Sequence, residues 1–452
     1  MSSQFADPNT GNVFIPYYGT QECYLVKYNN TATEPTVAHA ADNGKGYKVT
    51  GIGDSAFSTT IITQCTIQHA KSIGNEAFKD CDKLTNINMG NVTSISSNGF
   101  VGCILLTMVS IPKCISIGDN AFSGCSGLSS VDICEVTDIG VSAFGGCTEI
   151  THVNMQNVLH IGDEAFSGCS GLTDVDVCNV LSVGNNAFVN CLELESINMH
   201  EVGEIGDNAF IGCTSLTNVD MRNVVRIGAS AFEGTKITSI CLPYAIEIGE
   251  SAFAGCTGLE SVYLPNVTKI SANAFNGCSA LTEVCIPKIR YIGENAFKGC
   301  TSLTEITIPR SARSIGESAF DGCTHLKTLY FLASYNIDIG LNAFYTVGDV
   351  EQVTLTHYIS HIYIWCNIPY YRCKYSNLLA YNPDVFRQYY SDILHDYSTS
   401  IKKGCVISCI VGLGYISSNL LLSGVNNNQK KKKRLKKNPN CVSAFNPTQS
   451  FA

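Results

Sequence analysis

Tryptophan and charged residues are scarce in this sequence of 452 residues. It has one tryptophan, Trp365, and charged residues make up 15% of the chain, whereas hydrophobic residues make up 45%. A chain that cannot fold has the opposite balance, with many charges and few apolar residues. The composition therefore excludes a disordered chain and predicts a protein with a large buried core.

Motifs of catalysis and cofactor binding are also missing. The sequence has no nucleophile elbow, no His-Glu-x-x-His motif, no phosphate-binding loop and no dinucleotide fingerprint. It has no Cys-x-x-Cys pair and no cluster of Cys and His with zinc spacing. We therefore expect a protein that is not an enzyme and that uses no cofactor and no metal.

The charge of the chain is unevenly distributed. The formal net charge is -9, but the block Lys430 to Lys437 supplies seven positive charges, so residues 1–425 carry about -16. A body this acidic repels phosphate backbones, and we expect no nucleic-acid partner. The opening MSSQFADPNTGNVF has neither the basic start nor the apolar stretch of a secretory signal peptide.

What the sequence does contain is one segment repeated many times. IGDEAFSGCSGLTDVDV at 161–177 returns as IGDNAFIGCTSLTNVDM at 205–221. A period near 22 residues predicts a solenoid, in which each coil buries its apolar side against its neighbours. The recurrent aromatic residue is Phe57, Phe78, Phe100, Phe122, Phe144, Phe166, Phe188, Phe210, Phe232, Phe253, Phe275, Phe297, Phe320 and Phe344.

Each repeat combines an alternating apolar run with a Gly-containing turn. Leu172, Val175 and Val177 have the in-out-in spacing of a short strand, and stacked strands would form one parallel sheet with about 4.8 Å between coils. We expect Gly162 to adopt a backbone conformation closed to other residues. Asp163 suits the start of a short helical turn that presents Ala and Phe inward.

Cysteine is abundant, with 23 residues, but its placement follows the repeat. A position used once per coil is a packing position, and free cysteine is a small, frequently buried residue. We therefore favour a ladder of buried thiols over a disulfide framework or a metal site. The repeated position is occupied by Cys81, Cys103, Cys125, Cys147, Cys169, Cys191, Cys213, Cys256, Cys278, Cys300 and Cys323.

The full pattern resembles the BspA-like, or Treponema-type, leucine-rich repeat family over residues 50–345. The stretch from Leu281 to Cys300, with Pro287, Ile292-Gly293 and Ala296-Phe297, matches it without gaps. The expected fold is an α/β-type repeat solenoid, a right-handed leucine-rich-repeat superhelix of about 13 coils with a parallel sheet on one face. Members are surface proteins of mucosal bacteria and parasitic flagellate protists, and some are implicated in adhesion to host matrix and cells.

One repeat breaks the pattern. In AFEGTKITSICLP, starting at Ala231, the coil is one residue short and Thr235 replaces the cysteine. Beyond it, strand ends carry Pro243, Pro265, Pro287 and Pro309, and proline fixes where a strand stops. The break is either a seam between two batches of repeats or a scar of duplication.

The outward side of the strands predicts a binding surface, since solenoids bind partners along such extended faces. At one outward position of successive coils, Asp alternates with Asn or Ser, which avoids stacking like charges. The alternative is a solvated polar ladder without a ligand. The predicted ligand-binding residues are Asn88, Asp132, Asn154, Asp176, Asn198, Asp220, Tyr263 and Tyr330.

The two ends depart from the repeat. We expect an N-terminal cap over 1–49, a Tyr-rich C-terminal cap and stalk over 346–403, a transmembrane helix over 404–425 and a basic cytoplasmic tail over 426–452. The uncharged 404–425 segment is alternatively a buried terminal segment. With the repeats outside the cell, Asn29, Asn91 and Asn266 would be glycosylation acceptors of the N-x-T kind.

The sequence thus predicts a single-pass plasma-membrane protein whose extracellular repeats bind proteins or glycans of host or neighbouring cells, in adhesion. The alternative is a cytoplasmic scaffold of the same fold for protein–protein interaction, tail-anchored or soluble.

Overall fold

The structure is a computed structural model that describes residues 4–8, 10–29, 32–34, 39–42, 45–332, 337–347 and 352–355. Its N-terminal strands are β1 Phe5–Ala6, β2 Val13–Pro16, β3 Glu22–Lys27, β4 His39–Asp42 and β5 Lys45–Ile52. The pairs β1–β2, β2–β3 and β4–β5 are antiparallel, whereas β5 pairs in parallel with β3 and with β7, Ser72–Ile73, a strand of the repeats. β5 thereby joins this N-terminal group to the repeats.

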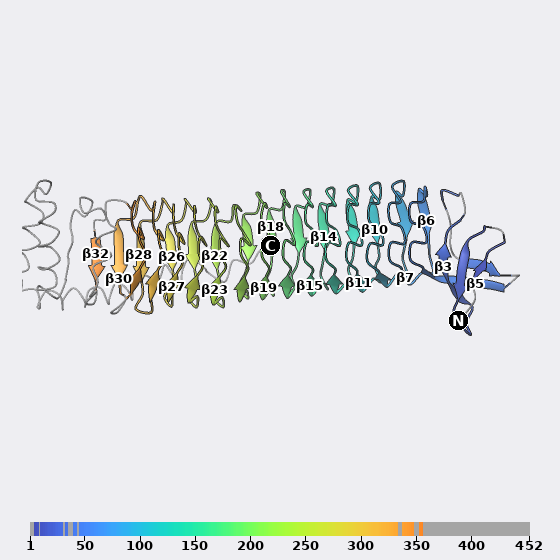
Figure 1. The fold of residues 1–452 in the computed structure, drawn as a ribbon, viewed down its shortest axis with the longest axis horizontal. Helices are drawn as coiled ribbons and strands as arrows, with labels where there is room; N and C mark the ends of the chain where they lie inside the picture. The colour runs from blue at the N-terminus through green and yellow to red at the C-terminus, as the bar shows by residue number, and fades with distance from the viewer. Residues whose placement is uncertain are drawn as a thin grey trace, which may run out of the picture. The chain divides into compact units, whose positions relative to one another are not determined.

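The repeats stack as coils in a single row (Figure 1). Each complete coil contributes two short strands. The longer strands are β6 Gln64–Thr66, β8 Asn86–Asn88, β10 Met108–Ser110, β12 Ser130–Asp132, β14 His152–Asn154, β16 Asp174–Asp176, β18 Ser196–Asn198, β20 Asn218–Asp220, β22 Ser239–Cys241, β24 Ser261–Tyr263, β26 Glu283–Cys285, β28 Glu305–Ile308, β30 Thr328–Phe331 and β32 Gln352–Leu355. They form three sheets, β6 to β20, β22 to β26 and β28 to β32, and pair in parallel within each.

The second strand of each coil has two residues. These strands are β7 Ser72–Ile73, β9 Ser94–Ile95, β11 Ser116–Ile117, β13 Asp138–Ile139, β15 His160–Ile161, β17 Ser182–Val183, β19 Glu204–Ile205, β21 Arg226–Ile227, β23 Glu247–Ile248, β25 Lys269–Ile270, β27 Tyr291–Ile292, β29 Ser314–Ile315 and β31 Asp338–Ile339. They form a second parallel ladder, with one residue outward and one buried in each strand.

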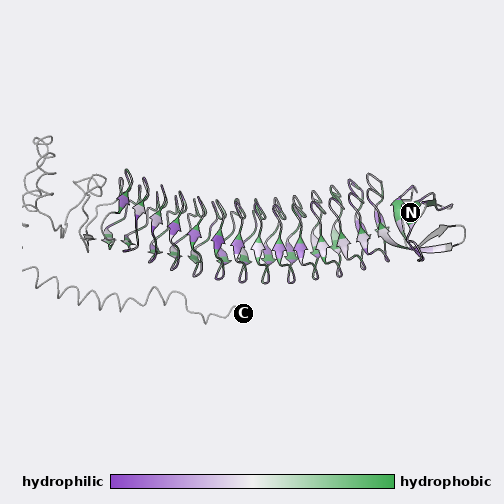
Figure 2. Ribbon diagram, turned by 60° about the horizontal axis from the view of Figure 1, so that its bottom comes forward, coloured by the Kyte–Doolittle hydropathy of each residue, from purple (hydrophilic) through white to green (hydrophobic). Residues whose placement is uncertain are grey.

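The predicted leucine-rich-repeat solenoid is confirmed: the molecule is a parallel-sheet solenoid of about 14 turns with a repeat near 22 residues. Hydrophilic and hydrophobic segments recur from coil to coil (Figure 2). The stack continues into the range predicted as a Tyr-rich cap, because β32 pairs in parallel with β30, Thr328 opposite Gln352.

The predicted helical turn differs from what is observed. Across the described residues this part of each coil forms consecutive turns, with no helix. The Asp163 carboxylate does not cap its own turn; its Oδ1 accepts the backbone N–H of Asn185 in the next coil at 2.7 Å. Asn185 in turn accepts the N–H of Asp207 at 2.8 Å. These side chains join one coil to the next.

The reason for glycine after the buried Ile also differs from the prediction. Gly162 is not in the left-handed region; the positive φ falls on Glu164, at 57°. A Cβ built on Gly162 would lie 2.8 Å from the carbonyl carbon of Gly140, which is closer than real Cβ contacts. Gly162 is therefore required by the close approach of two coils.

The core is a stack of phenylalanine rings flanked by thiols. From Phe57 to Phe344 the rings lie parallel, as in Phe166 and Phe188, whose centroids are 5.4 Å apart with planes 5° apart. The Tyr28 ring continues the stack at the N-terminal side, 4.7 Å from Phe57. The eleven repeat cysteines are buried free thiols, which confirms the predicted ladder.

The break at Thr235 is a seam in one sheet only. The longer strands from β6 to β20 form one eight-stranded sheet, and a separate sheet begins at β22. The second ladder runs through the same place, since Arg226 of β21 pairs with Glu247 of β23. Thr235 replaces the thiol, and its hydroxyl donates to the Phe232 carbonyl at 2.9 Å.

The predicted plasma-membrane localisation, with a single span and a cytoplasmic basic tail, is wrong. A span needs a helix of about 20 apolar residues. In the part of the chain that the structure describes, no helix is long and apolar enough to cross a membrane. The segment 404–425, on which the prediction depended, lies outside the described residues, as do 356–403 and 426–452.

Candidate functional site

The strand face, defined as the outward side chains of the longer strands β6 to β30, is the candidate binding surface. In most of the three-residue strands the middle residue is buried and the first and third residues point outward, as in His152–Asn154. The middle residues of β20 and β26, Val219 and Val284, are partly buried. The chain folds this way because Val153 and its equivalents belong to the apolar core. Two parallel columns of outward side chains therefore run along the coils.

The third residues of these strands form the predicted column, and the structure brings most of them into register. Asp132 pairs with Asn154, Asn154 with Asp176, and Asp176 with Asn198, which pairs with Asp220. Asn88 begins the column and is exposed. Tyr263 and Tyr330 lie in the same position beyond the seam, in two other sheets, so they do not adjoin the acidic part.

Several predicted residues also shape the chain. The side-chain oxygens of Asn88, Asn154 and Asp176 accept the backbone N–H two residues later, at 3.3, 3.2 and 3.2 Å. These bonds turn the chain at the strand end, as Asn and Asp commonly do. The alternative of a self-satisfying polar ladder therefore describes part of their role. One carboxylate oxygen of Asp176 remains outside that turn bond.

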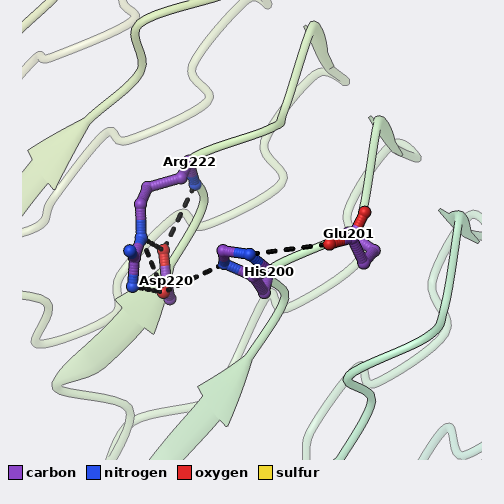
Figure 3. Close-up of polar contacts among 4 residues, drawn as sticks. All are labelled: His200, Glu201, Asp220 and Arg222. Atoms are coloured by element: carbon purple, nitrogen blue, oxygen red, sulfur yellow. Dashed lines mark hydrogen bonds and ion pairs between the residues drawn. The ribbon is translucent and has the colours of Figure 1, made fainter. Parts of the chain in front are cut away.

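A polar cluster that the sequence analysis missed lies where the eight-stranded sheet ends. Figure 3 shows Asp220 between Arg222 and His200. The Arg222 Nε lies 2.9 and 3.0 Å from the two Asp220 oxygens, and its Nη2 lies 2.5 Å from Oδ2. His200 Nδ1 is 3.8 Å from Asp220 Oδ2, and its Nε2 is 3.5 Å from Glu201. The sequence feature that could have revealed this cluster is the presence of His200 and Arg222 at the same position of successive coils.

Arg222 also sets the ionisation of this cluster. Burial of Asp220 opposes its ionisation, but the hydrogen bonds and charge of Arg222 outweigh burial and lower the pKa of Asp220. The pKa of Cys241, the next outward residue beyond the seam, is raised by burial and then by the Asp220 charge. The cluster is therefore an anchored ion pair with protonated Cys241 beside it. It contains no thiolate nucleophile near neutral pH.

The predicted glycosylation acceptors are all engaged by the backbone. Asn29 Nδ2 donates to the Gly11 carbonyl at 2.8 Å, and Asn91 Nδ2 and Asn266 Nδ2 donate to Gln68 and Pro243, each at 2.6 Å. Asn91 and Asn266 share a structural role in linking adjacent coils. Their modification stays a prediction.

The chemistry of the described surface fits binding. Among the residues that the structure describes, no three His, Cys, Asp or Glu side chains are grouped to hold a metal ion. The strand face presents hydroxyl, amide and carboxylate groups in long columns, whereas catalysis needs differentiated groups converging in a hollow. Such columns suit contact with an extended or large partner.

Known proteins share both the repeat and the fold. The model of the BspA-type leucine-rich repeat region matches residues 50–173, 137–260 and 246–375. A leucine-rich repeat protein from Bacteroides ovatus is 26% identical, with a TM-score of 0.55, over 75% of this chain and 92% of that one. A leucine-rich cell surface protein from Faecalibacterium prausnitzii is 26% identical over 73% and 88%, with a TM-score of 0.46.

The search of curated proteins returned no match. The family model covers well over half of the sequence, and the structural similarity to the Bacteroides ovatus protein covers 75% of it. The chain belongs to the BspA-type leucine-rich repeat family.

Proposed function

We propose that this protein is a binding module that holds macromolecular partners, chiefly proteins, against its strand face. Leucine-rich repeat proteins generally bind other proteins, which supports the class of partner. The observation that carries the proposal is the in-register outward column from Asp132 to Asp220, rigidly spaced by the coils below it. Rigid elements keep such groups in place before a partner arrives, which lowers the ordering cost of binding.

The residues that make this contact are the predicted column on the strand face. Asp132 and Asn198 are exposed, and Asp174 adds a second carboxylate to the strand that carries Asp176. The Asp220–Arg222 pair contributes a fixed donor and acceptor at the end of the sheet. Beyond the seam, Tyr263 and Tyr330 give the same face a more aromatic character. The two parts would recognise different portions of one partner.

Two biological settings are compatible with such a module. Adhesion to host cells, matrix or other cells is the narrower role that the family resemblance implies. A scaffold that assembles proteins inside the cell is the second candidate, and it would use the same strand face. Purified chain that binds intact cells, and loses this binding with strand-face substitutions, would support adhesion over the scaffold.

The test of the binding surface uses isosteric substitutions. The test variant combines Asp132→Asn, Asp176→Asn and Asp220→Asn. These changes remove three charges and keep the shape of the column, because Asn is already present in it at Asn154 and Asn198. The control carries Asp138→Asn, Glu204→Gln and Asp338→Asn, which remove as many exposed charges from the second ladder. We expect proteins captured by the wild-type chain to be lost with the first variant and kept with the control. Equal retention by both variants would reject the strand face.

A further inference from the structure

The outward column of the second ladder carries alternating charges near the seam. Glu204 pairs with Arg226, Arg226 with Glu247, and Glu247 with Lys269, all in register and all exposed. Within the chain, Lys269 Nζ contacts Glu247, and both side chains remain about half exposed. The order of charges along the coils is therefore negative, positive, negative, positive.

An exposed apolar ridge runs beside these charges. It is formed by Val225 and Ile246, which directly precede the neighbouring short strands β21 and β23 and are 39% and 57% exposed. Leu181, 46% exposed, holds the same position two coils earlier, whereas Gly203, Thr268 and Arg290 hold it before β19, β25 and β27. Tyr244, two residues before Ile246, is 59% exposed. Single exposed apolar side chains are ordinary, but neighbouring ones next to a charged border are typical of a contact surface.

We propose that this surface binds the same surface of a second copy in an antiparallel dimer. A column that reads negative, positive, negative, positive becomes positive, negative, positive, negative when it is reversed. Each charge then faces the opposite charge of the other copy, as in isologous interfaces with two-fold symmetry. A parallel arrangement would place like charges against each other. The charges thus select both the partner and its direction.

The register follows from counting complementary pairs. We place the two-fold axis between the coils of Arg226 and Glu247. Arg226 of each copy then faces Glu247 of the other copy, and Glu204 of each copy faces Lys269 of the other. This register gives four charge pairs. Moving the axis by one coil, between Glu204 and Arg226, leaves two such pairs and places Lys269 opposite His160. The first register also sets Val225 beside Ile246 of the second copy. The apolar ridge and the charges therefore agree on one axis.

The extent of this surface predicts a weak dimer. From Ser182 to Tyr291 the ladder spans six coils, or about 24 Å by the coil spacing. Such a patch falls below the area of a stable standard interface. Its charge pairs are exposed and would be screened by salt. We expect association that depends on concentration and weakens as salt is raised. It involves none of the strand-face residues assigned to partner binding.

The test uses two charge variants of the full chain in sedimentation velocity at low salt. One carries Glu204→Lys with Glu247→Lys, and the other carries Arg226→Glu with Lys269→Glu. Each variant alone should remain monomeric, whereas their equimolar mixture should regain the dimer seen with the wild type. A wild type that stays monomeric up to high concentration, or variants that self-associate as the wild type does, would overturn the proposal.

A milder pair of variants covers the case in which stacked like charges prevent folding. Ile246→Arg places a charge at the proposed axis and should weaken the dimer about tenfold or more. Ile115→Arg is the matched control, because Ile115 is 55% exposed at the same repeat position but lies outside the six coils. Ile115→Arg should dimerise like the wild type. Equal behaviour of the two variants would overturn the proposed axis.

Discussion

The thiol of Cys169 donates a hydrogen bond to the backbone carbonyl of Phe144 in the preceding coil, with 3.2 Å between Sγ and the oxygen. The same bond recurs from Cys81 to Cys323, as in Cys191 with Phe166 and Cys278 with Phe253, at 3.2 and 3.1 Å. Each thiol therefore satisfies a carbonyl next to the ring stack while filling a small apolar space. The aromatic and thiol columns form one continuous core that links every coil to its neighbour.

Truncating one ring of this core should destabilise the whole stack. Phe188 is fully buried between Phe166 and Phe210. We expect Phe188→Ala to lower the free energy of unfolding by about 3–5 kcal/mol, because it removes buried area and leaves a cavity. Denaturant unfolding followed by circular dichroism measures this change. An unchanged midpoint would contradict the buried stack.

The close approach of coils can be tested at two glycines. A Cβ at Gly162 would meet backbone atoms of Gly140 and Ile139 at 2.8 Å, whereas at Gly203 its nearest neighbour is the Leu181 oxygen at 3.8 Å. We expect Gly162→Ala to cost about 1–3 kcal/mol through overpacking. Gly203→Ala should change stability little. Thermal melts of both variants would show the contrast, and similar melts would argue against coil contact at Gly162.

Thiol reactivity should separate the core cysteines from the surface ones. Burial raises the pKa of the Cys169 thiol to about 12, and likewise that of Cys323. Their thiols stay protonated at pH 8 and are shielded, so iodoacetamide should leave them unmodified in the folded chain. Cys134 and Cys178 are partly exposed and should react first. Mass spectrometry of peptides from residues 4–347 decides this, and early labelling of Cys169 would contradict the buried ladder.

The Asp220–Arg222 ion pair should make the stability of the folded chain decrease at acidic pH. The pKa of Asp220 in the folded chain is lowered relative to an unfolded value of about 3.9. The stabilisation from the ion pair is therefore fully present above about pH 3.9 and is lost as pH falls through the folded-state pKa. Asp220→Asn should reduce stability at pH 7 by less than about 1 kcal/mol and match the wild type at the acid end. Asp176→Asn is the isosteric comparison. Denaturant titrations across pH 2–7 test this sign.

Much of the fold follows from the sequence because it depends on periodic apolar residues. The Phe column, the thiol ladder and the outward column with Asp132 and Asp176 repeat at one spacing, and spacing alone places them. The second ladder was not predicted, because strands of two residues such as Ser182–Val183 are too short to show alternation. The turn at Asp163 was misread because its partner, Asn185, is brought near only when the coils stack.

The position of the candidate site could be predicted from the sequence, but its side-chain contacts and its ligand could not. Alternation of Asp132, Asn154 and Asp176 predicted one outward column, and the strand register places these residues opposite one another. Their role in binding stays a prediction. The cluster of His200, Asp220 and Arg222 joins two coils at the sheet end that the short repeat with Thr235 marks. The contacts among these side chains were not predicted, because they form only when the coils stack. The ligand itself depends on side-chain complementarity with a partner, which a repeat pattern does not encode.

Hydroxyl-radical footprinting of the chain with a captured partner tests the binding surface most directly. His152 and Tyr263 report on the strand face, while His160 and Tyr291 report on the second ladder of the same solenoid. We expect the partner to protect His152, Tyr263 or both and to leave His160 and Tyr291 as reactive as in the free chain. Protection confined to His160 and Tyr291 would contradict binding through the strand face.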